Sequence, residues 1–378
     1  MFAAAVPDDI PLDELQGVFH IDEIRRDETA VEFVGEALLP PNRLMRELHI
    51  PFDRAGYRVS IDRLGPYRML VRAVPIADAR GGIPWINIAL FVLTIISTLL
   101  VGAFYWYYIP LPTALADPTV VLRAWPFTAA VLGVLATHEM GHYIAGRVHG
   151  VDVSLPYVIP FLFPFGTLGA VIRMRGHMPD RRVLFDIGVA GPLAGLVATI
   201  VVSIIGLSLP PVTVPSWAIV SDGQAIMFNT PPLLEIVAAA IGAQTEYPGM
   251  GQTVSPVVIG AWVGMFFTVL NLLPVGQLDG GHIIRAMVGR SQERVAAVVP
   301  LALFTIAGYL HLIRGYALNE SVALWIFWGF FAMVIAWRGP AHPVDETPLG
   351  PWRILIGVLT FALGALCFLL VPIEVTAV

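Results

Sequence analysis

Several uninterrupted apolar stretches, each about 20 residues long, dominate this sequence. A helix of that length spans the roughly 30 Å hydrocarbon core of a bilayer. The 378 residues are 57% hydrophobic and only 13% charged, which is about half the charge that a soluble domain normally carries. A water-soluble fold cannot bury so much apolar surface, so the sequence predicts a polytopic membrane protein.

Hydropathy predicts up to seven membrane spans. The segment 295–314 starts among charged residues and is also compatible with a tilted or interfacial helix, so we expect six to seven spanning helices. The predicted spans are 85–107, 125–147, 183–208, 256–275, 295–314, 321–337 and 353–372. The fold class is therefore an all-α membrane bundle, apart from the two regions described next.

The stretch 151–176 is apolar but contains five helix-breaking residues. These are Pro156, Pro160, Pro164, Gly166 and Gly169. Such a segment cannot form a continuous spanning helix. Non-helical backbone at membrane depth is tolerated only when it is buried in protein or lines a wet cavity. We therefore predict a membrane-dipping loop beside a cavity.

The N-terminal region differs from the rest because it is charged and includes ten arginines before Gly81. The β-rich runs Val31–Val34, Tyr57–Ile61 and Tyr67–Val74, with a helix at Asn42–Leu48, predict a small α+β module. We assign residues 1–82 to this soluble domain, whose role the sequence does not indicate, and residues 83–378 to the membrane domain. No secretory leader pattern opens the sequence.

Arginine placement predicts the orientation. The connection after the second span carries Arg147, Arg173, Arg175, Arg181 and Arg182, whereas residues 209–255 after the third span carry none. We therefore expect the former connection and the N-terminal domain to be cytoplasmic, in a multi-pass protein of the cell membrane. The chain has no lysine, and we expect no nucleic-acid partner.

A possible metal centre lies near the cytoplasmic end of the second span, at His138, Glu139 and His142, in the pattern H-E-x-x-H. Residues four apart share one helix face, so both imidazoles can bind one ion. Glu139 is adjacent and suits the base that takes a proton from a zinc-activated water. The pattern also arises by chance, but ionisable residues inside a span are costly and point to function.

Asp279 is the best candidate for a third protein ligand. It follows the fourth span within the segment 271–281, whose Pro274, Gly276, Gly280 and Gly281 break the helix. The orientation inferred from arginines puts this segment at the same side of the bilayer as His138. An ordinary helix cap at the membrane edge is the alternative interpretation of Asp279.

Four motifs in order resemble the site-2 protease family of intramembrane zinc metalloproteases. They are the H-E-x-x-H of residues 138–142, the F-G-T-L-G-A of 165–170, the G-P-L-A-G of 191–195 and the segment 271–281 with L-D-G-G. The similarity covers about residues 125–285. It implies one zinc per chain held by His138, His142 and Asp279, and a catalytic Glu139. It also implies an assisting asparagine, at the spacing of Asn271.

Several other residues have a structural as well as a functional interpretation. Asn271 is equally suited to link helices by its amide, and we expect Gly188, Gly191 and Gly195 to serve helix packing. We expect Gly166, Thr167, Gly169 and Ala170 to bind an unwound substrate, unless that loop merely plugs the bundle. The predicted substrate is a membrane-spanning protein, and the lipid bilayer is the other partner. The alternatives are a zinc or proton transporter and an inactive family relative; the sequence does not indicate the oligomeric state.

Overall fold

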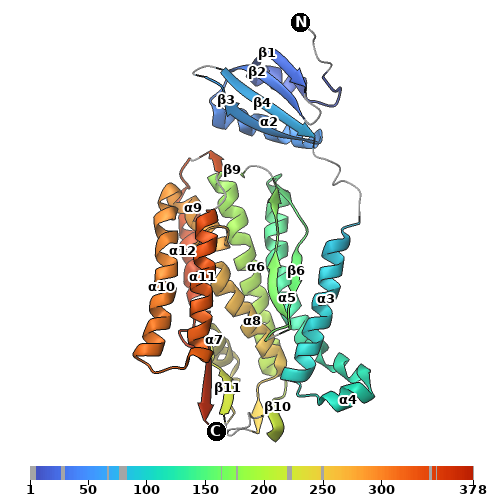
Figure 1. The fold of residues 1–378 in the computed structure, drawn as a ribbon, viewed down its shortest axis with the longest axis vertical. Coiled ribbons are helices and arrows are strands. Elements are labelled where there is room, and N and C mark those ends of the chain that lie inside the picture. Colours follow the sequence, from blue (N-terminus) through green and yellow to red (C-terminus); the bar gives the residue numbers. More distant parts are fainter. Residues whose placement is uncertain are drawn as a thin grey trace.

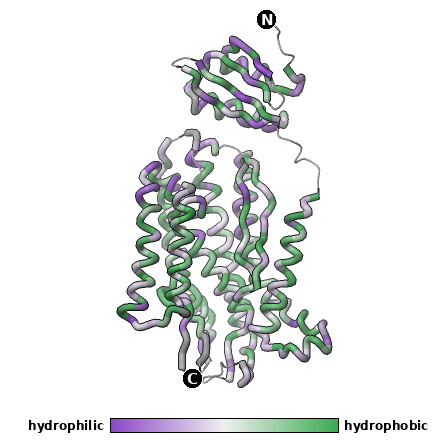
Figure 2. Tube along the Cα trace, in the orientation of Figure 1, coloured by the Kyte–Doolittle hydropathy of each residue, from purple (hydrophilic) through white to green (hydrophobic). Residues whose placement is uncertain are grey.

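The computed structural model describes residues 6–26, 30–65, 68–75, 83–162, 164–175, 178–218, 224–247, 251–339, 343–345 and 347–377. It contains a small N-terminal α+β domain followed by a mostly helical domain (Figure 1). Hydrophilic residues gather in the former, and hydrophobic residues line the long helices of the latter (Figure 2). The predicted fold class is confirmed.

The N-terminal domain is a four-stranded antiparallel sheet with two helices. Its elements are α1 (Leu12–Val18), β1 (Phe19–Arg26), β2 (Val31–Ala37), α2 (Pro41–Arg54), β3 (Tyr57–Arg63) and β4 (Arg68–Pro75), with strand order β1-β2-β4-β3. Alternating residues such as Phe33 and Val71 point to one face, where Leu44, Leu48 and Phe52 of α2 cover them. The predictions missed α1 and β1, because the charges of β1 obscure its alternation.

The described residues of the membrane domain form seven main helices. They are α3 (Trp85–Val101), α5 (Trp125–Val148), α6 (Arg181–Ser208), α8 (Pro256–Asn271), α10 (Gln292–Leu312), α11 (Ala323–Arg338) and α12 (Pro351–Ala365). The shorter helices are η1 (Gly102–Trp106), α4 (Leu111–Ala116), η2 (Pro118–Ala124), η3 (Ser216–Ala218), α7 (Pro232–Ile241), α9 (Asp279–Val288), η4 (Gly289–Ser291) and η5 (Leu318–Val322).

Each predicted span coincides with one main helix, and five helical segments of the described residues are long and apolar enough to cross a membrane. Helices α8 and α12 are shorter, with 16 and 15 residues. Helix α8 ends at Asn271 rather than at the predicted residue 275, because Pro274 and Gly276 interrupt it. The chain then turns and starts α9 at Asp279.

The predicted membrane-dipping loop contains a β-hairpin. Strands β6 (Tyr157–Pro160) and β7 (Thr167–Val171) pair antiparallel and lie alongside α3 and α5 (Figure 1). The other short strands are β5 (Asp152–Val153), β8 (Met174–Arg175), β9 (Met178–Asp180), β10 (Val212–Thr213), β11 (Gln224–Phe228), β12 (Gln252–Thr253), β13 (Pro343–Asp345) and β14 (Ile373–Ala377).

The two ends of the bundle carry different connections. Strand β9 and helix α9 lie at the end that faces the N-terminal domain, whereas β10, β11 and the chain's C-terminus lie at the opposite end (Figure 1). Successive main helices carry the chain in opposite directions along the bundle. Two connections that are separated by a single main helix, such as α6, therefore lie at opposite ends. The connection after α5, which carries Arg173 and Arg175 and leads to Arg181 and Arg182, and the connection 209–255 are therefore at opposite ends, as the orientation argument requires.

Candidate metal centre

Helix α5 brings the two histidines of the H-E-x-x-H pattern onto one side. Its only proline is Pro126 in the first turn, so the helix continues unbroken through the polar residues to Val148. His138, Glu139 and His142 are 5%, 3% and 4% exposed. Ionisable side chains buried in an apolar helix require partners, and the two histidines find theirs on neighbouring elements.

The turn after α8 presents Asp279 to the same place. Leu278 donates its backbone N–H to the Val275 carbonyl at 3.1 Å, which closes the turn just before α9. Gly280 and Gly281 pack directly on the backbone of residues 272–276, where any Cβ would overlap a carbonyl oxygen. These glycines therefore allow α9 to begin in contact with the turn, with Asp279 as its first residue.

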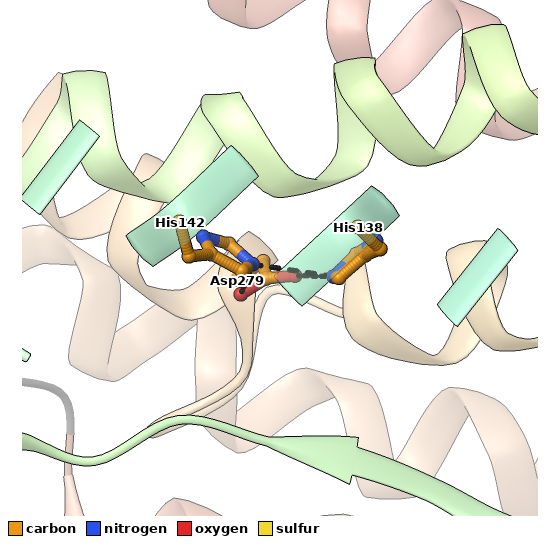
Figure 3. Close-up of side chains that lie close together, drawn as sticks. All are labelled: His138, His142 and Asp279. Carbon is orange, nitrogen blue, oxygen red and sulfur yellow. Dashed lines mark hydrogen bonds and ion pairs between the residues drawn. The ribbon is translucent and has the colours of Figure 1, made fainter. Parts of the chain in front are cut away.

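Three side chains converge, two from α5 and one from the start of α9 (Figure 3). Nε2 of His138 lies 3.0 Å from Oδ2 of Asp279, and Nε2 of His142 lies 3.1 Å from its Oδ1. The two Nε2 atoms are 3.2 Å apart. Ligands about 2.0–2.1 Å from a tetrahedral zinc ion are roughly 3.3–3.4 Å from one another. The set of two imidazole nitrogens and one carboxylate thus fits a zinc ion in both chemistry and spacing.

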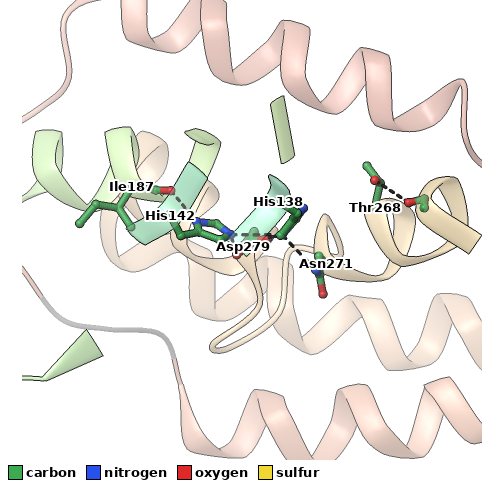
Figure 4. Close-up of polar contacts among 7 residues, drawn as sticks. His138, His142, Ile187, Thr268, Asn271 and Asp279 are labelled. Atoms are coloured by element: carbon green, nitrogen blue, oxygen red, sulfur yellow. Dashed lines mark hydrogen bonds and ion pairs between the residues drawn. The ribbon is translucent and has the colours of Figure 1, made fainter. Parts of the chain in front are cut away.

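Helix α6 fixes the orientation of His142. Nδ1 of His142 lies 2.8 Å from the carbonyl oxygen of Ile187 (Figure 4). An N–H at Nδ1 donates to that carbonyl, which leaves the lone pair of Nε2 directed at Asp279 and His138. A backbone acceptor of this kind is the usual outer partner of a metal-binding histidine.

Two glycines of α6 lie against the histidine rings. A Cβ at Gly191 would overlap Nε2 of His142, and one at Gly195 would lie 2.9 Å from Nδ1 of His138. On α5, Gly141 has the same relation to the Ala190 carbonyl. Gly191 and Gly195 therefore pack against the candidate metal ligands themselves, in addition to the helix packing that the sequence predicted. Gly188, by contrast, faces Ile283 on α9.

The side chain of Asn271 also reaches the cluster. Its Nδ2 lies 3.3 Å from Nε2 of His138 (Figure 4). Asn271 ends α8 and Asp279 starts α9, so the intervening turn brings both side chains to one point. His282 is buried nearby on α9, but the group that can bind a metal among the described residues consists of His138, His142 and Asp279.

The hairpin residues with a predicted substrate role all lie on β7 or its turn. Gly166 and Gly169 have positive φ of 84° and 106°, which glycine adopts readily. Thr167 is buried, and its hydroxyl donates to the Ile159 carbonyl at 2.9 Å. Ala170 pairs with Val158 of β6. The strand expected within residues 165–175 is therefore present.

Helix α3 holds the hairpin from the other side. Ser97 donates to the Gly166 carbonyl at 2.6 Å, and Thr94 donates to the Val158 carbonyl at 3.3 Å. At the turn, the ring of Phe165 packs within 5.6 Å of the Trp262 ring, centre to centre. The outer side of β6 is thus covered by α3, and β7 carries the other edge of the hairpin.

Sequence reasoning missed the Ile187 carbonyl, because a backbone group leaves no residue signature. It also missed the contact of Gly191 and Gly195 with the histidines. The four-residue spacing of these glycines matches that of His138 and His142, which is the signal that two facing helices would share.

Comparison with known proteins finds similarity in the central region of this chain. Residues 126–310 match the model of peptidase family M50. Among curated relatives, "Probable zinc metalloprotease EGY1, chloroplastic" of Arabidopsis thaliana is 31% identical over 258 residues, covering 65% of this chain and 44% of the relative. "Probable zinc metalloprotease EGY2, chloroplastic" of Oryza sativa subsp. indica is 30% identical over 252 residues, covering 65% and 42%. This chain thus spans less than half of either relative, and no solved structure matches it significantly.

Proposed function

Since residues 126–310 of this chain match the model of peptidase family M50, we propose that it is an intramembrane zinc metalloprotease that cuts a membrane-spanning protein. The observation that carries the proposal is the convergence of His138, His142 and Asp279 within the helical bundle. The names of the relatives, which describe probable zinc metalloproteases, support zinc as the ion, one per chain. Nothing in the site favours a transporter, which needs polar residues along a pathway.

Each polar residue of the site has a distinct proposed role. His138, His142 and Asp279 hold the zinc. When bound, this ion supplies a Lewis acid that polarises a peptide carbonyl and lowers the pKa of a water molecule. The Glu139 carboxylate takes the proton of the attacking water and passes it to the leaving nitrogen. The Asn271 amide donates a hydrogen bond to the carbonyl oxygen of the peptide.

We further propose that the substrate adds to the edge of β7. A helical carbonyl is already hydrogen-bonded and shielded by side chains, so the substrate helix must first unwind locally. Unpaired backbone groups in hydrocarbon cost several kcal/mol each, and an edge strand provides replacement partners. Gly166, Thr167, Gly169 and Ala170 shape this edge, while α3 occupies the opposite side of the hairpin.

The proposed location is the cell membrane, with the N-terminal domain and the metal site toward the cytoplasm. The arginine asymmetry between the connections supports this orientation, and five apolar helices support a multi-pass protein. The relatives named above are described as chloroplastic, which concerns those proteins alone.

Replacement of Glu139 by Gln tests the mechanism. The amide cannot accept the proton, so cleavage of a model membrane-spanning substrate in detergent should fall by at least ~100-fold. Zinc content should stay unchanged, because Glu139 is not among the converging ligands. Glu293→Gln, at an exposed position on α10, is the matched control and should retain activity. Undiminished cleavage by Glu139→Gln would refute the peptidase mechanism.

A further inference from the structure

Arg181, at the start of α6, is a buried arginine with defined acceptors. Its side chain is 7% exposed. Nε donates to the Ala286 carbonyl at 2.8 Å, and Nη2 donates to the Met287 carbonyl at 2.9 Å. A buried guanidinium loses its hydration, and that loss is compensated only by hydrogen bonds of this quality.

The two acceptors are carbonyls at the C-terminal end of α9. The last carbonyls of a helix have no partner within the helix, and the helix dipole makes this end negative. The planar guanidinium of Arg181 supplies two parallel N–H donors for these carbonyls. Its positive charge also interacts favourably with the negative end of the helix dipole. Gly289, with φ of 64°, ends the helix at this point, and a Cβ there would lie 3.5 Å from Nη1 of Arg181.

The opposite end of α9 carries Asp279. Asp279 and Ala286 are seven positions apart on the helix, which corresponds to about 10 Å at roughly 1.5 Å per residue. A short helix moves as a rigid unit over that distance. A bond that fixes the C-terminal end therefore also limits how far the Asp279 carboxylate can shift.

Helix α6 is thereby connected to both halves of the metal site. Its Ile187 carbonyl orients His142 of α5, and its Gly191 lies against the same ring. Its Arg181 holds α9, which supplies the third ligand. Helix α6 thus forms hydrogen bonds with both ligand-bearing helices, α5 and α9, and is a common reference for the three ligands.

We propose that Arg181 is a positioning residue that sets the place of Asp279 relative to His138 and His142, and so tunes metal affinity and coordination geometry. This inference rests on the proposed zinc site. Arg181 touches neither metal nor substrate. Its loss acts through α9, so the effect differs from that of removing a ligand: the site still forms, with its carboxylate less well placed.

The test compares Arg181→Lys and Arg181→Gln with Arg182→Lys and Arg182→Gln in the full chain in detergent. Arg182 is the neighbouring residue and is exposed, which makes it a matched control. Zinc affinity is measured by competition with a chromophoric chelator. Coordination geometry is followed from the visible absorption of Co²⁺ bound in place of zinc. Thermal unfolding without metal reports on folding alone.

We expect about tenfold weaker zinc binding in Arg181→Gln, at the low end of the effect of outer-sphere partners, together with an altered Co²⁺ spectrum. Arg181→Lys keeps the charge but not the fork, so it should fold and recover only part of the affinity. Should Arg181→Gln not fold, Arg181→Lys decides. Affinity and spectrum equal to those of the Arg182 controls would overturn the inference while leaving the zinc site intact. If the wild-type protein bound neither ion, both the proposed function and this inference would fail.

Discussion

Gly191 on α6 lies so close to His142 on α5 that a Cβ there would overlap Nε2, the atom directed at Asp279. A helix position that normally favours alanine is thus closed to any side chain by a candidate metal ligand. A side chain at position 191 must displace either the imidazole of His142 or helix α6. We expect the imidazole to move, because a change of its rotamer costs less free energy than separating packed helices.

Gly191→Ala should therefore weaken zinc binding by about 10-fold or more, the range seen when the support of a ligand is lost. Gly133→Ala is the control, since Gly133 lies on α5 with no atom near its Cβ position. Alanine favours helices over glycine, so this control should bind zinc normally and be no less stable. Chelator competition measures the affinity of both variants. Normal zinc binding by Gly191→Ala would show that the His142 ring is not held where the structure places it.

The purified protein should contain about one zinc per chain, and Asp279→Ala should lower that content. Loss of one of three protein ligands leaves a site with two imidazoles, too few for a catalytic zinc centre. Glu246 is an exposed acid in the connection between α7 and α8, and Glu246→Ala should not alter zinc content. Elemental analysis gives the result. Full zinc content in a His138→Ala, His142→Ala double variant would mean that the metal binds elsewhere.

The spans and the candidate ligands were predictable from sequence, for two physical reasons. Hydropathy reports directly on the solvent that a helix faces, and a four-residue spacing places His138 and His142 on one face. The convergence of Asp279 with the two histidines followed from the predicted orientation, because the second and fourth spans end at the same side of the bundle. The spans and the histidine pair are therefore visible within single helices, and the placement of Asp279 is visible from the order of the helices along the chain.

The supporting residues were harder to predict because their roles depend on contacts between helices. Nothing in the sequence around Arg181 distinguishes it from the exposed Arg182. The carbonyl of Ile187 has no side-chain signature, and β1 has charges on both faces. These features depend on three-dimensional packing, whereas sequence patterns describe one element at a time.

Cysteine labelling can test the proposed orientation in a Cys367→Ala background. Glu246 and Arg290 are both exposed and lie in connections that the arginine argument assigns to opposite sides. Glu246→Cys should react with an impermeant thiol reagent added to intact cells, whereas Arg290→Cys should react only after the membrane is opened. The reverse pattern would place the metal site at the outer face.

Strand β7 pairs with β6 on one side only among the described strands. Val158 directs its carbonyl away from the hairpin toward Thr94, and residues of such a pair both point their backbone groups outward. Its partner Ala170 therefore directs its N–H to the edge of β7 that faces away from β6. This N–H is available to a substrate that adds as a strand.

Ala170→Pro removes that donor and should slow cleavage while zinc stays bound, whereas Ala170→Ser keeps the N–H and should cleave normally. Substrate helices that unwind at lower cost should also be cut faster. A model helix with Gly near its cytoplasmic end loses roughly 1 kcal/mol of helix stability relative to one with Leu, which corresponds to about fivefold in rate if unwinding is limiting. Cleavage of this Gly and Leu pair by the wild type and both Ala170 variants provides the measurement. Equal rates for the two helices, together with full activity of Ala170→Pro, would exclude strand addition at β7 as the limiting step.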